Sequence, residues 1–215
     1  MQTLEEAHKY QEWHKLLLEN GLKINNIKPL HLVHKGKGEV LFALIHIDAQ
    51  DADGQKVLPI AMLRGHFVTV VTCLISKETG KKHLLLVKQR RIANGAVSFE
   101  HPAGMCDSEA NPRKVALKEV QEETGLEIAD SQLFMLSDKL LYSSPGLLDE
   151  GGYFFGCDVV LPQSEIDAFH NKNTGALGEN EFIQTYICLL EEAMPLFNNT
   201  NGLLAQMLYM QRMQK

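Results

Sequence analysis

The sequence has little of what several common protein classes require. Its four cysteines lie far apart and form no Cys-x-x-Cys pair, which argues against a disulfide framework or a zinc site. Basic residues are in the minority, with 21 Lys and Arg against 27 Asp and Glu, so a surface for nucleic acid is not expected. Hydrophobic runs stay shorter than the roughly 18 residues of a membrane span. The first residues, MQTLEEAHKYQEWHK, also lack the hydrophobic stretch of a signal peptide. We therefore expect a cytoplasmic protein that binds neither nucleic acid nor membrane.

The 215 residues suffice for one large domain, or for one domain with a small appendage. Helical spacing predicts a helix over 3–20, which Asn20 and Gly21 end. Further on, Asn111 as N-cap, Pro112 in the first turn and Gly125 as a stop predict a second helix. Because strands and helices alternate without a regular βαβ repeat, we predict a mixed α+β fold. Strands are expected at 30–33, 40–47, 57–62, 66–75, 84–87, 96–99, 133–141, 153–160 and 182–190, and further helical segments at 164–171, 191–197 and 203–211.

The predicted helix after Asn111 carries three carboxylates on one face. At 100° per residue, Glu119, Glu122 and Glu123 fall within about 100° of arc. Acids at these spacings repel each other by roughly 0.2–0.5 kcal/mol per pair, and the helix dipole disfavours anions in the last turn. A solvated surface helix tolerates such a cluster. A divalent cation such as Mg²⁺ also prefers carboxylate oxygens together with water and substrate phosphates. From the helix alone, both interpretations stay open.

The stretch from Gly104 to Leu126 resembles the signature of the Nudix hydrolases. That signature reads Gly, five residues, Glu, seven residues, Arg-Glu, an aliphatic residue, any residue, Glu-Glu, any residue, Gly and an aliphatic residue. Seven of the nine specified positions agree at the correct spacing. The two departures are Ala110 in place of the first Glu and Lys118 in place of the Arg, which supplies charge without a planar fork. Asp107 or Glu109 is an alternative carboxylate if the loop is shifted.

Other segments resemble one branch of that family, the ADP-ribose and ADP-sugar diphosphatases. The resemblance implies an α/β/α sandwich around a mixed β-sheet, with a Nudix domain over 56–215. Residues 1–55 would form an N-terminal helix and β-rich extension, a possible dimerisation element, so a homodimer is expected by analogy. The segments that carry the resemblance are Val87–Arg91, Glu100–Gly104, Ser144–Gly146, Asp149–Glu150 and Gly178–Glu181.

The resemblance also implies roles for individual residues. Mg²⁺, or Mn²⁺, would be bound by the carboxylates of Glu119 and Glu123, by the backbone carbonyl of Ala103, and by Glu122 directly or through water. A catalytic carboxylate is expected on a flexible segment that can close over the substrate, first Glu179 and then Glu181. Glu122 is the third catalytic candidate. Arg91, Glu100, Gly104 and Pro145 are the candidate substrate-binding residues, although a structural ion pair is the alternative role of both Arg91 and Glu100.

The activity implied is Mg²⁺-dependent hydrolysis of the diphosphate bond of ADP-ribose or ADP-glucose to AMP and a sugar phosphate. Other Nudix substrates, a GDP-sugar, a dinucleotide or a nucleoside triphosphate, form the first alternative. A catalytically weakened nucleotide-binding module is the second alternative, because Ala110 replaces a signature glutamate. His101 and Cys106 receive no role, and the Gly36–Gly38 turn is interpreted as part of a hairpin.

Overall fold

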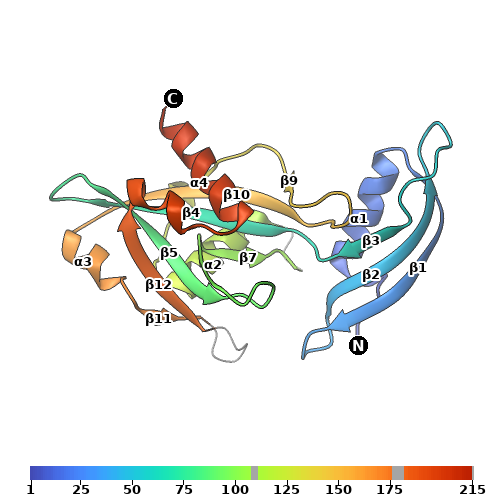
Figure 1. Cartoon of the computed structure of the whole chain (residues 1–215), viewed down its shortest axis with the longest axis horizontal. Helices are drawn as coiled ribbons and strands as arrows, with labels where there is room; N and C mark the ends of the chain where they lie inside the picture. Colours follow the sequence, from blue (N-terminus) through green and yellow to red (C-terminus); the bar gives the residue numbers. More distant parts are fainter. Residues whose placement is uncertain (108–110, 176–181, 215) are drawn as a thin grey trace. The chain divides into compact units, whose positions relative to one another are not determined.

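The structure is a computed structural model in which residues 1–107, 111–175 and 182–214 are described (Figure 1). The chain divides into two compact units. The first unit comprises Met1–His66, Cys106–Ala110 and Leu141–Gly152, and the second comprises Phe67–Met105, Asn111–Leu140 and Tyr153–Lys215. The predicted boundary between 55 and 56 stays a prediction.

In the first unit, one helix packs on a three-stranded sheet. The sheet has the order β1-β2-β3, and both pairs of neighbours are antiparallel. Inward-facing residues alternate along β2, and Ala43 and Ile45 are fully buried in a core with Trp13 and Leu63. The elements are α1 (His8–Glu19), β1 (Lys23–His34), β2 (Val40–Gln50), β3 (Ile60–Leu63) and β9 (Leu141–Tyr142), which pairs with Gly151 and Gly152.

The second unit is built on a larger sheet. Its strands follow the order β11-β12-β5-β4-β10-β8, with β6 paired to β5 and β7 paired to β4. Nearly every residue of β4 is buried, in agreement with its continuous hydrophobic run. The strands are β4 (Phe67–Ser76), β5 (Lys82–Arg90), β6 (Val97–Glu100), β7 (Ala103–Met105), β8 (Leu133–Met135), β10 (Gly151–Leu161), β11 (Asn173–Thr174) and β12 (Ile183–Leu189).

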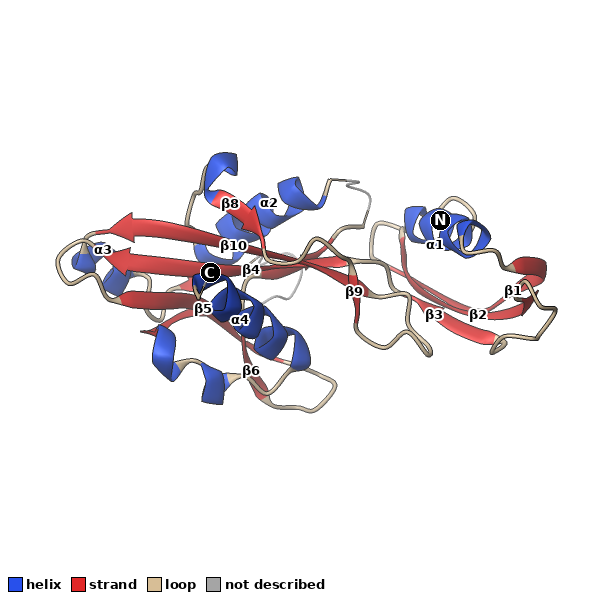
Figure 2. Cartoon of the chain, turned by 90° about the horizontal axis from the view of Figure 1, so that it is seen from above, coloured by secondary structure: helices blue, strands red, loops and turns tan. Residues whose placement is uncertain are grey.

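Helices cover both faces of this sheet. Figure 2 shows α2 and α4 on opposite sides of β4 and β10, and both helices contact β4. The predicted α+β class, with helices on either side of a mixed sheet, is confirmed. The helices of the second unit are α2 (Pro112–Thr124), α3 (Gln163–Ala168) and α4 (Thr200–Met213), with 3₁₀ turns at η1 (Asp130–Gln132), η3 (Leu190–Glu192) and η4 (Met194–Leu196).

The helix that carries the three glutamates is formed as predicted. Asn111 Oδ1 accepts the N–H of Arg113 at 3.0 Å, and Gly125 ends the helix with φ of 75° in the left-handed region. One other prediction was wrong in part. The strand expected over 133–141 is interrupted after Met135, because the Ser137 hydroxyl donates to Lys139 O and accepts from Lys139 N, which closes a turn. Residues 191–197, which were expected to be helical, form two short 3₁₀ helices, η3 and η4.

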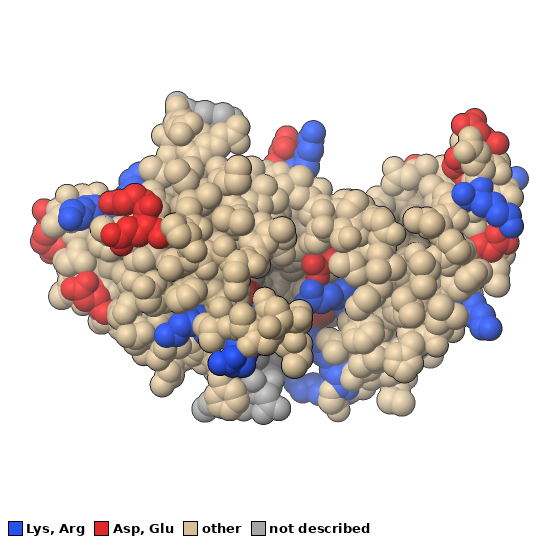
Figure 3. Space-filling model, in the orientation of Figure 1, with Lys and Arg blue, Asp and Glu red and all other residues tan. Residues whose placement is uncertain are grey.

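Charged side chains are dispersed over the face drawn in Figure 3. Lys and Arg occur there singly or in small groups, interleaved with Asp and Glu. Within the described ranges of the chain, no helix combines the length and the apolar composition needed to cross a membrane.

Candidate active site

Gly104 and Glu119 bring β7 and α2 into close contact. A Cβ atom built on Gly104 would lie 2.1 Å from Glu119 Cδ and 2.2 Å from Glu119 Oε1. No side chain fits there without displacing the carboxylate, so only glycine leaves room for it against the backbone of β7. The position of Gly104 is itself set by its antiparallel pairing with Val68 of β4. The Glu119 carboxylate therefore lies directly against the backbone of β7 at Gly104.

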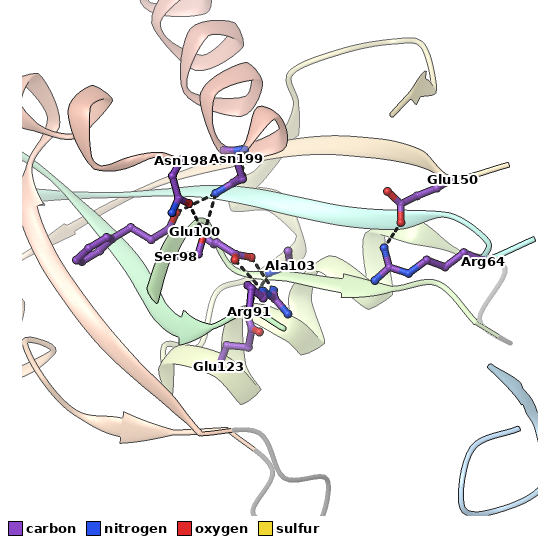
Figure 4. Close-up of polar contacts among 11 residues, drawn as sticks. Arg64, Arg91, Ser98, Glu100, Ala103, Glu123, Glu150, Asn198 and Asn199 are labelled. Carbon is purple, nitrogen blue, oxygen red and sulfur yellow. Dashed lines mark hydrogen bonds and ion pairs between the residues drawn. The ribbon is translucent and has the colours of Figure 1, made fainter. Parts of the chain in front are cut away.

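Glu123 lies one turn further along the same helix and is fixed by the preceding residue of β7. Its Oε2 accepts the backbone N–H of Ala103 at 2.9 Å (Figure 4). Only 7% of the surface of Glu123 is exposed. Its backbone carbonyl accepts a hydrogen bond from Thr174 Oγ1 at 2.5 Å. A buried carboxylate is costly unless hydrogen bonds or a cation compensate it, so the geometry suits a residue that holds a positive charge.

Glu122 has a different environment from the other two glutamates. It is exposed, and its Oε2 lies 3.0 Å from Lys118 Nζ in a pair one helical turn apart. Surface pairs of this kind contribute only about 0.3–0.5 kcal/mol to stability. The three glutamates of the predicted face thus range from exposed to buried.

The described side chains do not by themselves form a closed metal cage. In that part of the chain, no group of three His, Cys, Asp or Glu side chains is arranged to hold a metal ion. The structure contains two glutamates, Glu119 and Glu123, whose carboxylates contact the backbone of β7 at Gly104 and Ala103. Carboxylate and carbonyl oxygens are the ligands that hard divalent cations prefer, and Mg²⁺ usually completes its shell with water and substrate phosphates. The residues present therefore fit a site of that kind.

Arg91 and Glu100 form a two-point ion pair at the ends of neighbouring strands. Arg91 Nε donates to Glu100 Oε1 at 2.8 Å, and Arg91 Nη2 donates to Oε2 at 2.6 Å (Figure 4). Glu100 is the last residue of β6 and pairs with Val87 of β5, whereas Arg91 follows directly after β5. The guanidinium side chain is 47% exposed, whereas Glu100 is 16% exposed. The carboxylate orients the planar guanidinium group and leaves it accessible from solvent.

Pro145, Glu179 and Glu181 are the remaining predicted site residues. Pro145 belongs to the first unit and is exposed in a turn where Ser144 O accepts the N–H of Leu147 at 3.0 Å. Glu179, Glu181 and Ala110 lie outside the described residues. The roles predicted for all of these residues stay predictions.

His101 is a feature to which sequence reasoning assigned no role. Its side chain is 1% exposed and its ring lies 4.9 Å from that of Phe197, centroid to centroid. Neither ring nitrogen has a hydrogen-bond partner among the residues that the structure describes. Burial lowers the pKa of His101 to about 3, so the imidazole is neutral at physiological pH.

Asn199 is a second residue that the sequence did not single out. Its Oδ1 accepts the N–H of Gly202 at 2.6 Å as the N-cap of α4, and its Nδ2 donates to Phe99 O at 3.1 Å. The same amide group donates to Ser98 Oγ at 3.2 Å (Figure 4). Asn199 thereby fixes the end of β6 next to Glu100. Its N-cap role was readable from the sequence, but its partners lie about a hundred residues away.

The second unit has the architecture of a Nudix domain. Helices lie on both sides of a mixed sheet, and a short strand that contains a glycine, β7, packs against glutamates of the following helix, α2. The sequence profile of the NUDIX domain matches residues 66–202, and the chain belongs to this family. Among curated relatives, the putative nudix hydrolase 2 of Caenorhabditis elegans is 32% identical over 126 residues, which cover 58% of this chain and 52% of the relative.

Two relatives bear a more specific description. The ADP-ribose pyrophosphatase of Saccharomyces cerevisiae is 30% identical over 122 residues, covering 55% of this chain and 48% of its own length. The ADP-ribose pyrophosphatase of Bacillus subtilis is 30% identical over 126 residues, covering 59% of this chain and 60% of its own length. The chain thus matches about half the length of its curated relatives. A crystal structure of an ADP compounds hydrolase shares the fold, with a TM-score of 0.62 and 19% identity over 90% of this chain and 95% of the other.

Proposed function

We propose that the protein hydrolyses the diphosphate bond of an ADP-sugar, ADP-ribose or ADP-glucose, to AMP and a sugar phosphate in the presence of Mg²⁺. The observation that carries this proposal is the position of two glutamates against β7. The Glu119 carboxylate lies against the backbone of Gly104, and the Glu123 carboxylate accepts a hydrogen bond from the Ala103 N–H. The choice of substrate is supported by the two relatives that are named ADP-ribose pyrophosphatase.

In this proposal, Glu119, Glu123 and the carbonyl oxygen of Ala103 hold Mg²⁺, or Mn²⁺, and Glu122 contributes directly or through water. When bound, the cation neutralises charge on the diphosphate and lowers the pKa of a coordinated water. The N–H of Ala103 keeps one oxygen of Glu123 in a fixed direction. Gly104 leaves the space in which Glu119 sits. We also propose that Gly104 borders the substrate.

Binding of the substrate is assigned to the Arg91 and Glu100 pair. The guanidinium group of Arg91 carries the positive charge that a diphosphate attracts, and Glu100 sets the direction of its N–H groups. Pro145 is proposed to contact the substrate. The carboxylate that removes a proton from the attacking water is proposed to be Glu179 or Glu181, with Glu122 as the third candidate. We further propose a cytoplasmic homodimer in which residues 1–55 contribute to the interface.

Product analysis over a panel of nucleotides tests this function. The full chain is incubated with Mg²⁺ and ADP-ribose, ADP-glucose, a GDP-sugar, a dinucleotide or a nucleoside triphosphate, and the products are separated by chromatography. We expect AMP and a sugar phosphate from an ADP-sugar, with the highest kcat/KM in the panel. Preference for a triphosphate over every diphosphate-sugar would overturn the proposal.

A glutamate variant separates turnover from binding. Glu123→Gln preserves an oxygen that can accept the Ala103 N–H but removes the charge, so we expect kcat to fall by at least about 100-fold while ADP-ribose still binds in calorimetry. Glu127→Gln, at an exposed glutamate beyond the helix, is the matched control and is expected to keep full activity. If wild-type protein binds ADP-ribose at saturating Mg²⁺ without hydrolysing it, the weakened nucleotide-binding module replaces the proposed enzyme.

A further inference from the structure

The last turn of α2 depends on groups from outside the helix. It carries Glu122 and Glu123, and it contains no basic residue of its own. The last carbonyl groups of a helix have no partner inside the helix, and the helix dipole disfavours anions at this end. The N–H of Gly125 donates to the carbonyl of Gln121 at 2.8 Å. The carbonyl of Glu123 lies beyond that bond, so its partner comes from another part of the fold.

Thr174 provides the partner of the Glu123 carbonyl. Its Oγ1 donates to Glu123 O at 2.5 Å. Thr174 belongs to the two-residue strand β11, in which it pairs with Ile183 of β12 (Figure 1). These elements all belong to the second unit, as does β7. Glu123 is therefore held at two points by one sheet, at its carboxylate by the Ala103 N–H and at its backbone by the Thr174 hydroxyl.

Lys172 supplies positive charge at the same helix end. A Cβ atom built on Gly125 would lie 2.7 Å from Lys172 Nζ, so the ammonium group lies against the residue that ends α2. A cation near the C-terminus of a helix is favourable because it opposes the negative end of the dipole. The segment that contains Thr174 thus contacts the end of α2 at two places.

Thr185 anchors this segment to the core of the sheet. Thr185 lies in β12 and is fully buried. Its N–H donates to Lys172 O at 2.9 Å, and its Oγ1 accepts the N–H of Lys172 at 3.0 Å. Its carbonyl accepts the N–H of Asn171 at 3.0 Å. The position of the Thr174 hydroxyl is therefore set by contacts with a buried strand.

We propose that Thr174 is a positioning residue of the candidate metal site, which acts through the backbone of Glu123. By fixing the carbonyl of Glu123, its hydroxyl sets the direction in which the glutamate side chain leaves the helix. Removal of a group that orients a metal ligand typically costs roughly 10- to 100-fold in metal affinity or activity. A cap that only stabilised α2 would change the free energy of unfolding and leave the cation affinity as it is. The inference rests on the proposed function, but cation binding and turnover are measured separately.

Three variants and a matched control test this role. Thr174→Val preserves the shape of the side chain and removes its hydroxyl, whereas Thr174→Ser keeps the hydroxyl. Thr174→Ala also removes the hydroxyl and takes the place of Thr174→Val if circular dichroism shows that the valine variant does not fold. Thr79→Val is the control, because Thr79 Oγ1 accepts the N–H of Lys81 at 3.2 Å in the exposed turn between β4 and β5 of the same unit.

The first readout is the binding of Mn²⁺ without nucleotide, measured by titration calorimetry. We expect Kd to rise about tenfold in Thr174→Val and Thr174→Ala, and to match wild type in Thr174→Ser and Thr79→Val. The second readout is turnover of an ADP-sugar. The Mg²⁺ concentration that gives half of the maximal rate should also rise about tenfold in the first two variants. At saturating Mg²⁺, KM for the nucleotide should change less than about twofold, since Arg91 is untouched.

Mn²⁺ affinity equal to that of wild type in Thr174→Val and Thr174→Ala would overturn the inference, even if both variants are less stable. A loss of affinity in Thr174→Ser, or an equal loss in Thr79→Val, would also overturn it, because the hydroxyl bond to Glu123 would then not be the cause. If wild-type protein binds Mn²⁺ but hydrolyses no nucleotide, the proposed function fails and calorimetry alone decides the inference. If wild-type protein binds no Mn²⁺, the inference is wrong.

Discussion

Glu119 occupies the space that a Cβ atom on Gly104 would require, with its Cδ 2.1 Å from that position. The contact joins a three-residue strand to a helix that begins eight residues after Gly104. Because the glycine lies in a paired strand and the glutamate on a packed helix, neither partner can easily withdraw. Glycine is therefore required at position 104 because any side chain there would overlap the Glu119 carboxylate. This reason is independent of backbone conformation.

Replacement of Gly104 by alanine tests this relationship directly. We expect Gly104→Ala to reduce kcat/KM for an ADP-sugar by at least about 100-fold, because the added methyl group displaces the Glu119 carboxylate. Steady-state kinetics and circular dichroism measure the activity and the retained fold. Gly36→Ala is the matched control, since nothing lies within 4 Å of the added atom and its φ is not positive. An active Gly104→Ala enzyme would show that Glu119 need not sit there.

Arg91→Lys should alter substrate binding more than turnover. Lysine keeps the charge but loses the two-point contact with Glu100, so we expect KM for ADP-ribose to rise about five- to tenfold with little change in kcat. The free energy of unfolding should change by less than about 1 kcal/mol, because the pair is partly exposed. Arg90→Lys, at the neighbouring exposed arginine, is the control for kinetics. A KM equal to that of wild type would leave Arg91 with a structural ion pair only.

His101 should make the protein less stable in mild acid. Its pKa is lowered to about 3 by burial, whereas an unfolded histidine titrates near 6.5. Below pH 6.5 the unfolded chain binds a proton that the folded chain excludes, so this residue costs about 1.4 kcal/mol of stability per pH unit down to about pH 3. Denaturant titrations between pH 7.5 and 4.5 measure the slope. His101→Phe should remove that part of it, and an identical slope in the variant would contradict the assignment.

The four cysteines should differ sharply in reactivity. Burial raises the pKa of Cys73 to about 11 and that of Cys157 and Cys188 to about 12, so their thiolate fractions at pH 8 are small. Cys106 is partly exposed. Brief alkylation of the native protein with iodoacetamide at pH 8, followed by peptide mass spectrometry, should label Cys106 first, and all four thiols should react after unfolding. Equally rapid labelling of Cys73 in native protein would contradict the burial.

Patterns among neighbouring residues were enough to predict much of this protein. The caps at Asn111 and Gly125 determined where α2 begins and ends, and the helical period placed three glutamates on one of its faces. Alternating and continuous hydrophobic runs located most strands, because such patterns report which side of a strand is buried. The failure at 133–141 arose from a side-chain turn at Ser137, which competes locally with strand pairing.

Only the tertiary structure decided how the site is arranged. Helical spacing treats Glu119, Glu122 and Glu123 alike, but β7 lies against two of them and leaves Glu122 exposed. The hydroxyl group that holds the backbone of Glu123 likewise comes from Thr174, far away in the sequence. Local periodicity and caps are properties of adjacent residues, whereas burial and ion pairing depend on which distant segments pack together. The sequence by itself therefore determined the helix and its carboxylates, and packing determined which of them are held in place.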